Sequence, residues 1–112
     1  MKIVIAIIEP DKLDKVSAAL TKISVQGMTV TEVKGYGRQR GPTKTHSGTE
    51  YPVRFMPEIK IEVAVPTERV DLVIETIETA VRNGQVDDGE IFVVDLEQAV
   101  RMRSGETDSD AI

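Results

Sequence analysis

The feature that most constrains the fold is a repeated pattern, in which an apolar strand is followed by a proline-opened amphipathic helix. Residues 2–8 form a near-continuous apolar run rich in β-branched residues, which is typical of a central strand. Pro10 suits the first turn of a helix, and apolar residues then recur at helical spacing up to Ile23. The pattern returns at 59–65, where apolar and polar residues alternate, and in the helix that follows Pro66.

Two further strands complete the plan. Met28–Val33 alternates as a strand, Ile91–Val94 forms a fourth, and Asn83-Gly84 is expected to end the second helix. The order βαββαβ predicts a ferredoxin-like α+β fold, with both helices on one face of an antiparallel sheet. The remaining segments are a long loop at 36–57, a short extended or turn-rich piece at 99–103, and a polar acidic tail at 104–112.

Length and composition limit the classes of function. The 112 residues predict a single domain over 1–112, and the net charge of −5 disfavours nucleic-acid binding. The absence of cysteine excludes disulfides and thiolate metal sites and fits a cytoplasmic protein. The apolar run near the N-terminus is too short to insert into a membrane and lacks a signal-peptide pattern.

The first strand is apolar on both of its faces. Ile5 and Ile7 alternate with Val4 and Ala6, so both sides of this strand require a buried environment. Two helices can cover only one side of the sheet. We therefore expect other subunits to cover the second side, in a homo-oligomer.

The start of the long loop combines glycines with basic and amide side chains. Gly35, Gly37 and Gly41 let the backbone approach a ligand closely, and Arg38 and Arg40 supply positive charge. This combination suits a phosphate or carboxylate group. A solvated hairpin loop is the alternative interpretation.

The chain resembles the PII signal transduction proteins, the trimeric nitrogen-regulatory family. The resemblance extends over all 112 residues, and the matching segments are 27–35, 37–39, 48–51, 60–62, 88–89, 91–93 and 101–106. It implies a homotrimer that binds an adenine nucleotide (ADP, ATP or AMP) in clefts between subunits. It further implies that the loop 36–57, the T-loop of the family, reports the bound ligand to target proteins such as a membrane transporter or a metabolic enzyme.

The resemblance also assigns candidate residues. Thr29, Glu62 and Ala64 correspond to positions that hold adenine and ribose, and Arg101 and Arg103 to a basic pair from the neighbouring subunit. Because these arginines are two apart, we expect both to point from one face of an extended segment; solvated terminal charge is the alternative. Further nucleotide-binding positions are Ile7, Gly35, Gly37, Arg38, Gln39, Asp87, Asp88, Gly89 and Glu90.

Two other features of the family involve the long loop. Gln39, together with nucleotide phosphates, is the candidate ligand for magnesium, and no other metal site is expected. Tyr51 occupies the position of a uridylylated tyrosine, with an exposed tyrosine of no special role as the alternative. Arg40, Lys44 and Arg54 favour an acidic partner surface.

Three residues depart from the family pattern. Glu58 and Glu90 stand where typical members have lysines for 2-oxoglutarate and for phosphate, and Asp87 replaces a glycine. Reversing a charge about 4 Å from an anion changes the interaction by roughly 8 kcal/mol at an effective dielectric of about 20, before solvent and salt reduce it. We therefore expect weak or absent 2-oxoglutarate sensing and no preference for ATP over ADP.

The cleft could adjust to these reversals in three ways. It could favour ADP or AMP, it could recruit a divalent cation through its carboxylates, or Arg40 and Arg54 could replace the lysines. A constitutive interaction module with a vestigial cleft and a sensor of another small metabolite remain as alternative functions. Catalysis is not expected, because the chain has no cysteine and its single histidine, His46, lies in the loop; a Glu58–Glu90 acid/base pair is the one candidate.

Overall fold

The structure is a computed structural model, which describes residues 1–36, 54–82 and 89–112. The strands are β1 (Lys2–Ile8), β2 (Thr29–Gly35), β3 (Met56–Val65) and β4 (Glu90–Asp95), and the helices are α1 (Leu13–Lys22) and α2 (Val70–Val81). Short 3-10 turns precede both helices at Pro10–Lys12 and Thr67–Arg69, and a third spans Asp108–Ala111.

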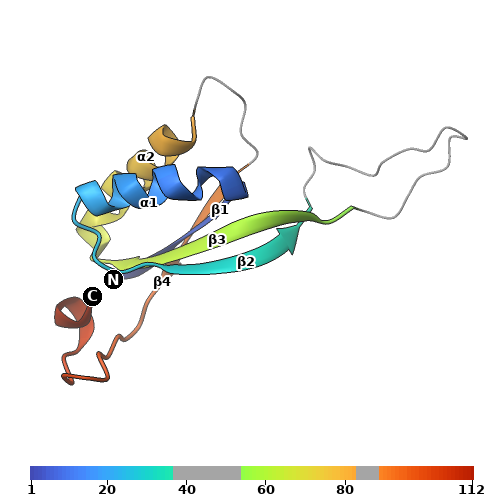
Figure 1. Cartoon of the computed structure of the whole chain (residues 1–112). Helices are drawn as coiled ribbons and strands as arrows, with labels where there is room; N and C mark the ends of the chain where they lie inside the picture. The colour runs from blue at the N-terminus through green and yellow to red at the C-terminus, as the bar shows by residue number, and fades with distance from the viewer. Residues whose placement is uncertain (37–53, 83–88) are drawn as a thin grey trace, which may run out of the picture.

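The four strands form one antiparallel sheet in the order β2-β3-β1-β4. Both helices lie on the same face of this sheet, and the segment that follows β4 runs away from the helices (Figure 1). The ferredoxin-like arrangement predicted from the element order is therefore confirmed.

The end of α1 shows how the chain turns back toward the sheet. Ser24 adopts a left-handed φ of 69°, and its amide donates to the Thr21 carbonyl at 3.0 Å. The Val25 amide donates to the Leu20 carbonyl at 3.0 Å. These two bonds form a Schellman cap with serine in the position that glycine usually takes. The cap directs residues 25–28 along the end of the sheet, toward the start of β2.

The core lies between the helices and one face of the sheet. The buried residues of each element recur with its own period, two in the strands and about 3.6 in the helices. They are Val4, Ala6, Ile8, Val16, Leu20, Val25, Ile59, Ile61, Val63, Val65, Val73, Ile77 and Val81. Among the described residues, no polar or charged side chain is buried.

The opposite face of the sheet is also apolar at its centre. Ile3, Ile5 and Ile7 of β1 alternate with the buried residues and are only half-buried. Phe92 pairs with Ile5 across β1 and β4, and it remains 48% exposed. Val94 pairs with Ile3 in the same way and is 44% exposed. We call this side of the sheet the open face.

Several element boundaries differ from the prediction. β3 begins at Met56 and not at 59, so its first residues fall inside the predicted loop. Pro57 pairs with Lys34 and Glu58 with Val33, because the ladder continues past the point where the apolar alternation ends. β2 likewise extends to Gly35. The expected helix end at 83–84 lies outside the described residues.

Candidate functional site

A cavity of about 630 Å³ lies at the end of the sheet where β2 begins and β3 ends. Its walls come from the α1–β2 connection, the two strands, the turn before α2 and the C-terminal segment. The lining residues are Ser24, Val25, Gln26, Gly27, Met28, Thr29, Glu62, Ala64, Val65, Pro66, Arg69, Arg101, Ala111 and Ile112. The cavity contains Thr29, Glu62 and Ala64, which the resemblance assigns to adenine and ribose. It also contains Arg101 of the same chain, whereas the resemblance assigned this arginine to a neighbouring subunit.

Strand register explains how three of these residues meet. Thr29 and Glu62 are direct cross-strand partners, and Ala64 lies two residues further along β3 on the same face. The Glu62 carboxylate has a cationic neighbour, because Lys60 Nζ lies 3.8 Å from its Oε1. Both side chains are about one-third exposed. Glu62 therefore offers a partly shielded hydrogen-bond acceptor in the lining of the cavity.

Arg101 reaches the cavity from a short hairpin. Its backbone amide donates to the Glu106 carbonyl at 2.8 Å, and its carbonyl accepts from the Gly105 amide at 2.7 Å. Its guanidinium Nη2 donates to the Ala111 carbonyl at 3.2 Å. The arginine is thus anchored at both its backbone and its side chain.

Arg103 is placed differently from Arg101. Residues 102–104 form a turn, so the predicted extended segment with both arginines on one face is wrong. Arg103 is exposed and does not line the cavity. The tight hairpin that closes at Gly105, whose φ is +76°, accounts for this difference.

A second group of predicted residues lies nearer the other end of the sheet. Ile7 and Glu90 are cross-strand partners on the open face, and Gly89 precedes Glu90. Gly35 ends β2, where a Cβ added to it would lie 2.5 Å from Glu58 Oε1. The Glu58 carboxylate therefore covers the backbone of Gly35 at the base of the loop.

The two groups are separated along the strands. Gly35 and Thr29 are six residues apart on β2, which corresponds to about 20 Å. One chain therefore does not bring all of the described candidates around one small molecule. Gly37, Arg38, Gln39, Tyr51, Asp87 and Asp88 lie outside the described residues.

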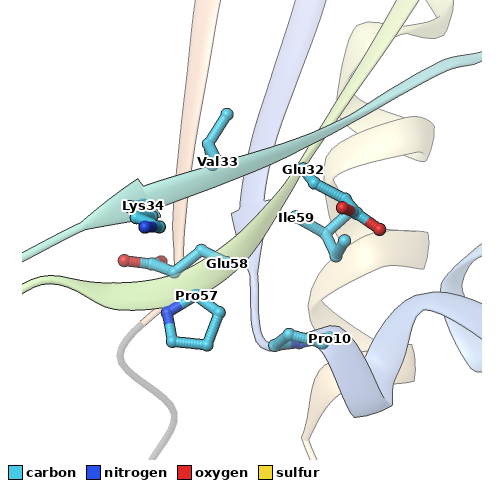
Figure 2. A pocket seen from close by; sticks show the side chains of 7 residues that line it. All are labelled: Pro10, Glu32, Val33, Lys34, Pro57, Glu58 and Ile59. Carbon is cyan, nitrogen blue, oxygen red and sulfur yellow. The ribbon is translucent and has the colours of Figure 1, made fainter.

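A separate pocket of about 490 Å³ lies beside the loop end of β2 and β3. Figure 2 shows its lining, which comes from β2, β3 and Pro10. Glu32 and Lys34 pair with Ile59 and Pro57, so they belong to the helix side of the sheet and not to the open face. This pocket contains none of the residues predicted to bind a nucleotide.

Sequence reasoning missed part of the cavity wall. Arg69 lines the cavity, and its Nη2 donates to the carbonyl of Ile23 at the end of α1. Ala111 and Ile112 also line it, although the sequence predicted only a polar tail there. The proline that opens the second helix could have pointed to Arg69, whereas no periodic pattern marks the C-terminal residues.

The described residues include no group of three or more metal-ligating side chains. Away from the cavity, a hydrogen bond from the Lys2 ammonium and the charge of that group lower the pKa of Asp95. Within the described residues, the candidate site consists of hydrogen-bonding groups and arginines.

Comparison with known proteins decides the family. The family model described as "Nitrogen regulatory protein P-II" matches residues 1–106. The chain belongs to the PII family. It is 58% identical to the nitrogen regulatory protein P-II of Rhizobium etli and 52% identical to that of Rhodobacter capsulatus. It is 49% identical to the nitrogen regulatory protein P-II 1 of Escherichia coli, and all three similarities cover the full length of both chains.

These relatives are named as regulators, which agrees with a role in nitrogen signalling. Across 1–36, 54–82 and 89–112, the PII chain has no helix long and apolar enough to span a bilayer.

Proposed function

We propose that this PII chain is a nitrogen-regulatory signalling protein that binds an adenine nucleotide in clefts between the subunits of a homotrimer. ADP or AMP is bound at least as well as ATP, and 2-oxoglutarate is sensed weakly or not at all. The bound ligand is reported through the loop 36–57 to a target protein, such as a transporter or a metabolic enzyme.

One observation carries the proposal. The family resemblance assigned Thr29, Glu62, Ala64 and Arg101, which lie in separate parts of the sequence, and they line a single cavity. A hydroxyl, a carboxylate and a guanidinium around partly apolar walls are suited to a polar heterocycle bearing a sugar and phosphate. The guanidinium supplies a charge that attracts phosphate oxygens.

The open face supports the trimeric form of the proposal. Its centre holds Ile5, Ile7 and Phe92, which are apolar and partly exposed in a single chain. A second copy packed against this face would bury them. It would also let the cavity that contains Thr29 in one subunit meet the residues around Gly35 in another. Within one chain, the separation of about 20 Å along β2 keeps these two sets of residues apart.

The carboxylates near the loop support weakened 2-oxoglutarate sensing. Glu58 Oε1 lies over Gly35 at the base of the loop, and Glu90 is exposed beside Ile7 on the open face. Each adds negative charge where the family places a cation for an anionic ligand. A dicarboxylate and a terminal phosphate are the ligands most disfavoured by that change.

Thermal protection tests whether a nucleotide binds at this cavity. We expect ADP to raise the unfolding temperature of the wild-type protein, because a ligand that binds only the folded state stabilises it. Arg101→Ala is expected to lose most of that protection. The matched control is Arg82→Ala, which removes an exposed arginine that pairs with Glu78 at 3.0 Å on α2. Equal protection of Arg101→Ala and the wild type, or no protection of the wild type by ADP, ATP or AMP, would overturn the proposal.

A further inference from the structure

The C-terminal segment, residues 108–112, folds back onto the cavity that contains Thr29 and Glu62. Its 3-10 turn spans Asp108–Ala111, and Ala111 and Ile112 are half-buried where they line the cavity. The segment is therefore part of the cavity wall, although its sequence is polar and acidic.

A set of hydrogen bonds fixes this segment. The Asp108 amide donates to the Ala99 carbonyl at 2.8 Å, and the Ala99 amide donates to Asp108 Oδ1 at 3.3 Å. Asp108 adopts a left-handed φ of 53°, which turns the chain back toward Arg101. Val100 and Thr107 form an isolated β-bridge just before this point. The local geometry places the Ala111 carbonyl within reach of a guanidinium.

That carbonyl holds the side chain of Arg101. Nη2 of Arg101 donates to the carbonyl oxygen of Ala111 at 3.2 Å, although Arg101 is an exposed residue. A long exposed arginine loses considerable rotamer freedom when it binds a ligand. A carbonyl that restrains it beforehand reduces that loss, and the remaining guanidinium N–H groups stay available for an anion.

We propose that residues 108–112 position Arg101 for the nucleotide, through the Ala111 carbonyl. The inference rests on the proposed function, because it assigns these residues a role in the same site. Arg103 is not positioned in this way, since it lies in the exposed turn and does not line the cavity. The two arginines of the predicted pair therefore depend differently on the C-terminal segment.

A double-mutant cycle tests this dependence. The measurement is ADP affinity by calorimetry for the full chain, for a chain that ends at Ser109, and for each of these with Arg101→Ala or Arg103→Ala. Removing Asp110–Ile112 is expected to weaken ADP binding by about three- to tenfold, the equivalent of one net hydrogen bond. In the Arg101→Ala background the truncation should have no further effect. In the Arg103→Ala background the full effect should remain.

A full-length variant guards against a general effect of truncation. Asp108→Ala removes the carboxylate that anchors the segment to Ala99, and it should weaken ADP binding in the same Arg101-dependent way. Thermal unfolding without nucleotide shows whether either variant has lost its fold.

The outcomes separate the inference from the proposed function. If the full chain binds ADP and the truncated, folded chain binds it equally well or more tightly, the positioning role is wrong while the nucleotide site stands. If truncation weakens binding equally in the Arg101→Ala and Arg103→Ala backgrounds, the segment does not act through Arg101. If the full chain binds no nucleotide, both proposals fail.

Discussion

Phe92→Glu should dissociate the proposed trimer without unfolding the chain. Phe92 is 48% exposed on the open face and pairs with Ile5 at its apolar centre. A phenylalanine buries roughly 200 Å² in total, so about 100 Å² remains to be buried by a second subunit. At about 25 cal/mol per Å² this is worth about 2.5 kcal/mol per subunit, or about 7.5 kcal/mol in a trimer, before the cost of burying the introduced charge.

Light scattering coupled to size exclusion measures the mass of the assembly. The wild-type protein is expected to elute as a trimer and Phe92→Glu as a monomer, with circular dichroism showing that the monomer keeps its secondary structure. Leu72→Glu is the matched control, because Leu72 has a similar exposure of 43% but lies on α2, in the helix layer on the other side of the sheet. A trimeric Phe92→Glu protein, a monomeric wild type, or equal dissociation of Leu72→Glu would refute the reasoning.

Three further predictions concern stability and the charge of the cleft. Leu20→Ala should lower the free energy of unfolding by about 2–5 kcal/mol in denaturant titrations, because Leu20 is fully buried in the core; a loss below about 1 kcal/mol would contradict the packing described. Asp95→Asn should lower the unfolding temperature near neutral pH, since the Lys2 hydrogen bond depresses the pKa of Asp95 below its ordinary value of 3.8. The difference in unfolding temperature between the wild type and Asp95→Asn should vanish as the pH falls through the folded-state pKa of Asp95. If this difference persists in acid, the ion pair is not its cause. Glu90→Lys should increase the ATP affinity measured by calorimetry more than tenfold over wild type, even if solvent and salt reduce the estimated charge effect to about a quarter. The control Glu75→Lys, at an exposed position of α2, should not increase it. An equal rise in both variants would indicate a general effect of net charge.

Local patterns predicted the elements of the fold. Leu13, Val16, Leu20 and Ile23 recur at the spacing of one helix face, and the structure places a helix there that begins at Leu13. The start of β3 could not be predicted in this way. Met56 and Pro57 do not alternate with buried residues, and they join the strand only because β2 continues to pair with them.

Four of the residues that line the cavity were among the predicted candidates, but their arrangement was not predictable. Thr29 and Glu62 are cross-strand partners, a relation that depends on register and that no local motif encodes. The two-residue spacing of Arg101 and Arg103 suggested a shared face, but the turn at 102–104 separates them. Ala111 became part of the cavity through a left-handed residue, Asp108, whose conformation the sequence does not indicate.

Calorimetric titration with ADP and ATP, each with and without magnesium and 2-oxoglutarate, tests the central claim most directly. We predict that ADP binds at least as tightly as ATP and that adding 2-oxoglutarate changes these affinities little or not at all. Cooperative binding of magnesium-ATP and 2-oxoglutarate would contradict this prediction. Glu58 and Glu90 would then fail to repel the anionic ligands that these two carboxylates are proposed to disfavour.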